Sequence, residues 1–209
     1  PYGLKQKVEF EKGFGPKLGE LNLEEMSKID EIDFVERVYP VYKAIKKVST
    51  NNITKDKNTI GFVGAPWTLL VYIINQQSPK KKLKDDFFKD DFLINRILLI
   101  LEKFLKIHIK NQIDNGANVI QIFDSWAGLL EEKDLPNYVY SPTLNLVNYV
   151  KSLNTPVICF PREIKNYSEF CDIVKPDVVG IDYNVDPKKI LDEVKIPIQG
   201  GLDPKILLS

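Results

Sequence analysis

The sequence is poor in histidine and cysteine and has no excess of either charge. Its single histidine, His108, and its two cysteines, Cys159 and Cys171, are too few for a usual zinc site, a disulfide framework or a serine–histidine–aspartate triad. The 29 basic and 29 acidic residues balance, which argues against nucleic acid or an anionic membrane as the main partner. The sequence shows no secretory segment and no apolar run long enough to span a bilayer, so a cytoplasmic protein is expected.

What the sequence does contain is a regular alternation of apolar runs and amphipathic segments. Strands are expected at 59–63, 118–123, 156–160, 177–181 and 196–199. Helices are expected at 34–47, capped by Asp33, and at 92–115, 142–153, 167–174 and 187–194, with another starting at Pro66. No Asn-Gly or Asp-Gly hairpin signal separates adjacent strands, so parallel pairing through crossover helices is expected.

The fold class that follows is α/β, a (β/α)8 TIM barrel that is incomplete in this chain, because a full barrel needs about 250 residues. Residues 1–209 are expected to form one such partial domain. The alternative is an open doubly wound sheet, although no Gly-x-Gly-x-x-Gly fingerprint follows any strand. The chain opens at Pro1, has its one methionine at Met26, and stops where a helix starts after Gly201-Leu-Asp-Pro204, so it reads as the middle of a longer protein.

Two other segments are less regular. Residues 1–20 are expected to be a loop with one short strand near 7–10. Residues 78–91 form a block of mixed charge, which is either a lid or patch for an acidic ligand or a solvated helix face or loop. The alternating signs favour the solvated surface.

The strand ends carry the candidate chemistry. Segments just after the strands are rich in aromatics and glycines and modest in charge, which suits a flat, bulky ligand with acidic groups; they are Gly64-Ala-Pro-Trp67, Asp124-Ser-Trp126, Pro161-Arg-Glu163, Asp182-Tyr183 and Gly200-Gly-Leu-Asp203. Single residues have more than one interpretation. Asp124 suits either a general acid or base or a helix cap, whereas His108, Asp182, Asp203, Trp67 and Trp126 are expected to be structural.

Two of these segments resemble a known family. Gly61-Phe-Val-Gly-Ala-Pro-Trp-Thr-Leu-Leu-Val-Tyr72 and Phe123-Asp-Ser-Trp-Ala-Gly128 are similar to the signatures of uroporphyrinogen decarboxylases. Weaker matches follow in the family's order along nearly the whole chain; they are Gly13-Phe-Gly-Pro16, Phe160-Pro-Arg162, Val179-Gly-Ile-Asp182 and Gln199-Gly-Gly-Leu-Asp-Pro204. Two departures are Ile73-Ile-Asn-Gln-Gln-Ser78, where the family usually has Glu-Gly-Gly, and Gly201, where asparagine is common.

The resemblance implies a cytosolic (β/α)8 enzyme of haem biosynthesis that uses no cofactor and is usually a homodimer. Such an enzyme decarboxylates the four acetate side chains of uroporphyrinogen III to give coproporphyrinogen III. The resemblance makes Tyr72 and Ser125 substrate-contacting hydroxyls and lays Phe62 against the tetrapyrrole, and Arg162 is added as a partner for a substrate carboxylate. The two hydroxyls are expected to converge on one mouth of the barrel.

The family's aspartate and arginine loop are expected upstream of Pro1, and its histidine downstream of Ser209. No residue of the 209 is therefore assigned as catalytic, and the chain alone is expected to be inactive. Three alternatives stay open: a zinc- and corrinoid-dependent methyltransferase with the same barrel, a non-catalytic tetrapyrrole-binding module, and a TIM barrel of other chemistry. Cys159 and Cys171 do not supply the His-x-Cys pair that the methyltransferase would need.

Overall fold

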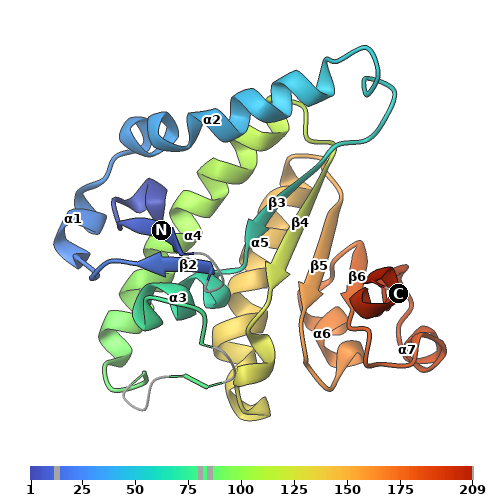
Figure 1. Ribbon diagram of the computed structural model, residues 1–209. Helices are drawn as coiled ribbons and strands as arrows, with labels where there is room; N and C mark the ends of the chain where they lie inside the picture. Colours follow the sequence, from blue (N-terminus) through green and yellow to red (C-terminus); the bar gives the residue numbers. More distant parts are fainter. Residues whose placement is uncertain (12–14, 80–81, 84–86, 209) are drawn as a thin grey trace.

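A curved parallel sheet organises the protein (Figure 1). The computed structural model describes residues 1–11, 15–79, 82–83 and 87–208. Each of its parallel strands pairs with the next along the chain; they are β3 (Ile60–Gly64), β4 (Val119–Asp124), β5 (Val157–Pro161), β6 (Val178–Ile181) and β7 (Ile198–Gly200). All five lie within two residues of the strands predicted from the apolar runs, and the predicted parallel pairing is confirmed.

The order of the strands decides between the two predicted architectures. It runs β3-β4-β5-β6-β7 without the reversal that defines a doubly wound sheet. Side chains on one face of the sheet, such as Val63, Ile122 and Cys159, are buried under the helices. Phe62 on the opposite face is 64% exposed. A parallel sheet in chain order with helices on one face is a segment of barrel wall, so the predicted incomplete (β/α)8 barrel is confirmed.

The crossover helices follow the predicted amphipathic segments closely. They are α3 (Pro66–Asn75), α4 (Asp91–Asp114), α5 (Ser141–Ser152), α6 (Tyr167–Val174) and α7 (Pro187–Glu193). Pro66 occupies the first turn of α3, as expected for a residue without an N–H to leave unpaired. Gly116 follows the end of α4 with φ of +108°, and a side chain there would collide with Ser49. The glycine therefore both ends α4 and lets the end of α2 (Glu31–Ser49) approach it.

The predicted cap of α2 was wrong by three residues. Asp30 is the cap, because its side chain accepts a hydrogen bond from the backbone N–H of Asp33 at 2.8 Å. The backbone N–H of Asp33 is one of the first-turn donors that have no partner within the helix, and the cap satisfies it. The side-chain carboxylate of Asp33 instead pairs with Lys5 at 3.2 Å.

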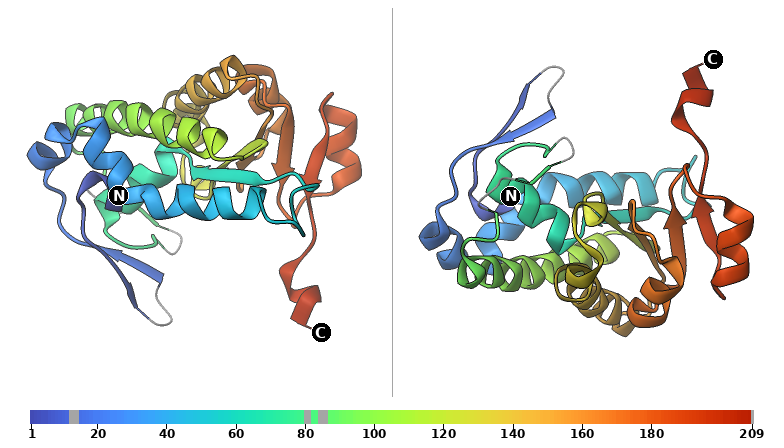
Figure 2. Two further views of the ribbon diagram at one scale, coloured as in Figure 1. Left: turned by 90° about the horizontal axis from the view of Figure 1, so that it is seen from above. Right: turned by 90° about the horizontal axis from the view of Figure 1, so that it is seen from below.

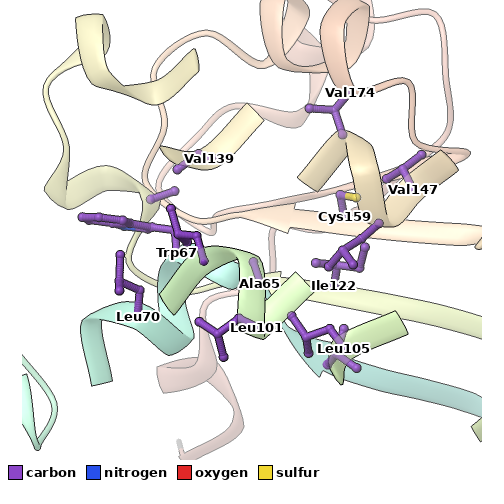
Figure 3. Packing of buried hydrophobic residues seen from close by; sticks show 14 of the residues in the cluster. Ala65, Trp67, Leu70, Leu101, Leu105, Ile122, Val139, Val147, Cys159 and Val174 are labelled. Atoms are coloured by element: carbon purple, nitrogen blue, oxygen red, sulfur yellow. The ribbon is translucent and has the colours of Figure 1, made fainter. Parts of the chain in front are cut away.

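The core lies between the outer face of the sheet and the helices. Figure 3 shows Ile122 and Cys159 of the sheet close to Leu101 and Leu105 of α4. Trp67, at the start of α3, is fully buried, with its ring centroid 5.4 Å from that of Phe87 and 5.7 Å from that of Tyr138. The expected structural role of Trp67 is therefore confirmed, and burial of so large a ring fixes the start of α3 against the sheet.

The N-terminal region holds more structure than predicted. β1 (Val8–Glu11) matches the expected strand, but it pairs antiparallel with a second strand, β2 (Gly15–Leu18), which was missed. This hairpin projects beside the helices in Figure 2. Before α2 lie a short helix η1 (Tyr2–Leu4) and α1 (Leu23–Lys28). Part of the charge block at 78–91 lies outside the described residues, so its two interpretations remain predictions.

Short helical turns complete the connections. β4 leads to α5 through η2 (Ala127–Leu129), η3 (Glu132–Asp134) and η4 (Pro136–Tyr140), and η5 (Pro204–Leu208) follows β7. The two ends of the described chain lie on opposite sides of the molecule (Figure 2). Among the described helices, none combines the length and the apolar character that crossing a membrane requires.

Candidate ligand-binding site

A cavity of about 520 Å³ opens at the carboxyl ends of β4 to β7. In barrels of this type the carboxyl ends of the strands carry the ligand sites. Its lining includes Ser125 and Arg162, two of the predicted site residues, together with Gln121, Phe123, Phe160, Gly180, Ile181, Asp182, Tyr183, Gln199, Gly200, Gly201, Leu202 and Pro204. The structure thus brings four of the five predicted strand ends together.

Aromatic rings cover the open face of the sheet beside this cavity. Phe62, Phe123 and Phe160 stand on neighbouring strands, with edge-to-face centroid distances of 5.9 Å and 6.1 Å between successive rings. Phe62 lies outside the cavity lining but is joined to it through Phe123. Gly180 lies beside Phe160, and a Cβ at position 180 would come within 2.9 Å of that ring. The three rings form an apolar wall that suits a flat ligand.

Arg162 is the cation of the cavity wall, and it already faces two carboxylates. Its Nη2 lies 3.0 Å from Oε1 of Glu163, and its Nε lies 3.8 Å from Oδ1 of Asp182. The arginine and Glu163 are both partly exposed, whereas the Asp182 side chain is only 5% exposed. Glu163 is the nearer carboxylate, but solvent screens this pair, so an acidic ligand could displace Glu163 from Arg162 at little cost.

Asp182 holds the loop that carries Arg162. Its Oδ2 accepts hydrogen bonds from the backbone N–H of Glu163 at 2.6 Å and from the hydroxyl of Tyr167 at 2.8 Å. Glu163 has a φ of +62°, and Gly128 packs so closely on it that a side chain there would collide. The structural role expected for Asp182 is therefore confirmed, and the residue also lines the cavity.

The loop that carries Ser125 is tied to helix α3. The buried hydroxyl of Thr68 donates to Oδ1 of Asp124 at 2.6 Å and accepts from the backbone N–H of Trp126 at 3.3 Å. The indole N–H of Trp67 donates to the carbonyl of Trp126 at 2.8 Å. Ser125 is therefore flanked on both sides by residues anchored to the first turn of α3.

Asp124 does not cap the helical turn that follows it, η2, because Trp126 holds the cap position there, so the helix-cap interpretation of Asp124 was wrong. Its side chain is 3% exposed and points to the helix side of the sheet, where Thr68 is its partner. Burial raises the pKa of this carboxyl to about 7, although the bonds from Thr68 act in the opposite direction. A carboxyl buried away from the cavity does not exchange protons directly with a ligand there.

Tyr72 lies one helical turn beyond Thr68 on α3 and is half-buried. Its ring packs edge-on against Trp126, with 6.1 Å between centroids. Trp126 follows Ser125 directly, so Tyr72 is joined to the cavity through one side chain, but it is not among the residues that line it. The convergence of the tyrosine and serine hydroxyls on one mouth thus stays a prediction.

The remaining chemistry-bearing residues lie away from this cavity. His108 lies on α4 and faces α2, where its Nδ1 lies 2.9 Å from the hydroxyl of Tyr42. Cys159 is buried in β5, and burial raises the pKa of its thiol. Within the described part of the chain, no group of three or more histidine, cysteine, aspartate or glutamate side chains could hold a metal ion.

Some residues of the site were missed from the sequence. Gln121 and Gln199 line the cavity. Gln121 lies two residues before the inward-facing Phe123 on the same strand, and this spacing is the signal that could have found it. Thr68 was missed as well, although a lone polar residue in the apolar run Pro66-Trp-Thr-Leu-Leu-Val71 suggests a buried hydrogen bond.

Comparison with known proteins shows which protein family this chain matches. A family model described as uroporphyrinogen decarboxylase (URO-D) matches residues 1–209. A uroporphyrinogen decarboxylase of Rickettsia bellii is 32% identical over 215 residues, and one of Campylobacter jejuni is 34% identical over 212 residues. These matches cover 100% and 98% of this chain, and the chain spans 63% and 62% of the relatives' own lengths.

A solved structure supports the fold independently. It is titled a methyltransferase from Methanosarcina mazei and superposes with a TM-score of 0.73 over 95% of this chain and 60% of its own. Its sequence identity of 16% is low, so the likeness concerns the barrel fold alone.

Proposed function

The chain belongs to the uroporphyrinogen decarboxylase family, and on this basis we propose that its protein converts uroporphyrinogen III to coproporphyrinogen III in porphyrin and haem biosynthesis. Residues 1–209 would be one partial barrel domain of that enzyme. The observation that carries the proposal is the placement of Ser125 and Arg162 at one cavity beside an aromatic wall, in a chain that matches the family along its whole length.

The reaction replaces each acetate side chain by a methyl group. The bond between the methylene carbon and the carboxylate breaks, carbon dioxide leaves, and a proton takes the place of the carboxylate. The electrons of the broken bond need a sink, which a protonated pyrrole ring provides. A carboxylate near the ring would stabilise that cation; the family resemblance would place this carboxylate, with further arginines, upstream of Pro1.

The described residues would bind and orient the substrate. The rings of Phe62, Phe123 and Phe160 would cover the plane of the tetrapyrrole, and the hydroxyls of Ser125 and Tyr72 would donate to its carboxylates. Arg162 would contribute one positive charge. We propose no cofactor, because protonation of the substrate's own pyrrole supplies the electron sink. A cytoplasmic homodimer and the absence of activity in residues 1–209 alone belong to the same proposal.

The test is to incubate the full-length protein with uroporphyrinogen III under reducing conditions and to separate the products by chromatography. Formation of coproporphyrinogen with release of carbon dioxide is the expected result. Binding without turnover would indicate instead a tetrapyrrole-binding module. Failure both to bind and to convert the substrate would contradict the proposal.

Substitution of Arg162 by methionine tests the site directly. Methionine keeps much of the apolar stem but removes the charge, and loss of a hydrogen bond to a charged group weakens binding by about 1.5–3 kcal/mol. Because Glu163 already partners the arginine, we expect the lower end, a rise of about tenfold in KM for uroporphyrinogen.

Arg96→Met is the matched control, since Arg96 is exposed on the outer helix α4. It should leave KM unchanged. Equal KM values for the Arg162 variant and this control would show that Arg162 does not bind the substrate.

The methyltransferase alternative is less well supported by the site. Cys159 is buried in the outer face of β5, and Cys171 lies on α6. Neither cysteine is among the residues that line the cavity, so the thiolate ligands that such a zinc site requires are not at the cavity among the described residues.

A further inference from the structure

We infer that Thr68 is a positioning residue of the site, which fixes the Ser125 loop relative to the helix that carries Tyr72. The inference rests on the proposed function, since it assigns a purpose to the placement of those two hydroxyls. Thr68 itself does not line the cavity, so its effect on a ligand would pass through its neighbours.

The first argument is the number of bonds that meet at one hydroxyl. Thr68 donates to the Asp124 side chain and accepts from the Trp126 backbone N–H. These two residues stand immediately before and after Ser125 in the chain. Since a hydroxyl has one proton to donate and lone pairs to accept, Thr68 satisfies both contacts at once and restrains the backbone on each side of Ser125.

The second argument is that the same turn of α3 holds the loop at further points. The backbone N–H of Ala65 donates to the carbonyl of Phe123 at 2.8 Å, and Trp67 donates to the carbonyl of Trp126. Tyr72 follows Thr68 by one helical turn and packs on the Trp126 ring. A shift of the turn at Thr68 would therefore displace the serine loop and the tyrosine relative to each other.

The third argument extends the chain of contacts to Arg162. The backbone N–H of Arg162 donates to the carbonyl of Asp124 at 3.0 Å, and its own carbonyl accepts from Gly128 at 3.0 Å. The Asp124 strand end thus lies between the Thr68 hydroxyl and the loop of Arg162. Removing the hydroxyl is expected to affect the binding of a ligand that spans Ser125 and Arg162, because a small misplacement of orienting groups is sufficient to slow a reaction strongly.

The experiment is a double-mutant cycle in the full-length protein with uroporphyrinogen as the probe. Thr68→Val keeps the shape of the side chain and removes both hydrogen bonds, whereas Thr68→Ser keeps the hydroxyl. We expect kcat/KM to fall about tenfold or more in Thr68→Val and to stay within about twofold of wild type in Thr68→Ser. In a Ser125→Ala background, Thr68→Val should have a smaller further effect than in the wild type, since one of the groups that it positions is absent.

Thr143→Val is the matched control. Thr143 is a buried threonine in the first turn of α5, next to Pro142, just as Thr68 lies in the first turn of α3 after Pro66. This variant should reduce stability without changing kcat/KM. A general loss of packing would lower kcat/KM in both valine variants alike, and that result would overturn the inference.

Two outcomes separate the inference from the function on which it rests. If Ser125→Ala turns over substrate like wild type, the proposed role of Ser125 fails and its positioning by Thr68 fails with it. If Ser125→Ala is impaired but the two substitutions multiply independently, the proposed function stands and the inference is wrong.

If Thr68→Val does not fold, hydrogen exchange of the Trp126 amide in the wild type and in Thr68→Ser decides whether this amide is bonded to the side chain at position 68. Slow exchange in both proteins supports the hydrogen bond to residue 68, and exchange as fast as in an exposed loop refutes it.

Discussion

Replacement of Asp124 by asparagine is expected to remove a contribution to stability of about 4 kcal/mol that Asp124 makes at acid pH and loses as pH rises. An aspartate in the unfolded chain titrates near its ordinary pKa of 3.8, whereas burial raises the pKa of Asp124 to about 7 in the fold. Below pH 3.8 both states are protonated, and the contribution to stability is fully present. As pH rises towards 7 the unfolded state loses its proton first, so this stability is progressively lost.

The measurement is urea unfolding of both proteins between pH 3.5 and 8. The difference in unfolding free energy, variant minus wild type, should rise by about 4 kcal/mol from acid to neutral pH. Asparagine retains an oxygen that can accept the bond from Thr68. Cys159 on β5 also interacts with Asp124, but burial raises the pKa of the thiol, which stays neutral throughout this range. Asp192→Asn, exposed on α7, is the control and should give a flat difference; a flat difference for Asp124→Asn would contradict the prediction.

Replacement of His108 by asparagine is expected to remove a contribution to stability with the opposite pH dependence, one that is lost as pH falls. Burial lowers the pKa of His108 from 6.5 to about 4. Above pH 6.5 the imidazole is neutral in both states, and its contribution to stability is fully present. As pH falls from 6.5 to 4 the unfolded state takes up a proton that the folded state refuses, and about 3 kcal/mol is lost.

Asparagine at position 108 can place an acceptor near the Nδ1 position, opposite the Tyr42 hydroxyl, without a titratable group. The difference in unfolding free energy, His108→Asn minus wild type, should then rise by about 3 kcal/mol as pH falls from 7 to 4. A difference that does not change with pH would show that His108 makes no such contribution.

The two buried groups oppose each other over the same range of pH. Between pH 4 and 6.5 the contribution of Asp124 falls with rising pH, and that of His108 grows. The wild type should therefore show less pH dependence from this pair than either single variant does, and the double variant should again be nearly level.

Much of the fold was predictable because its main signals are local. Apolar runs followed by amphipathic segments located every strand of the large sheet and its crossover helices. The strand β2 was missed because Gly15 and Pro16 give it little strand propensity, and its pairing with β1 sets its conformation. The cap of α2 was missed because Asp30 and Asp33 carry the same side chain, and only the position where the helix begins distinguishes them.

The sequence was sufficient to predict which strand ends form the candidate site. Alternation along β4 could also have shown that Asp124 faces the helices, since Ile120 and Ile122 share its face and Phe123 and Ser125 point the other way. The contact of Arg162 with Asp182 was not predictable, because it depends on a turn at Glu163 whose positive φ carries no clear sequence signal. Tyr72, Ser125, Phe62 and Arg162 remain predictions as substrate ligands.

Gly180 lies in the cavity wall at a position where a side chain would contact the ring of Phe160. The hydrogen at the α-carbon of Gly180 leaves room for the ring of Phe160, which a methyl group would approach to 2.9 Å. An alanine at this position would push the ring towards Phe123 and narrow the floor on which a planar molecule could rest. Gly180 thus helps to set how far such a molecule can enter the barrel.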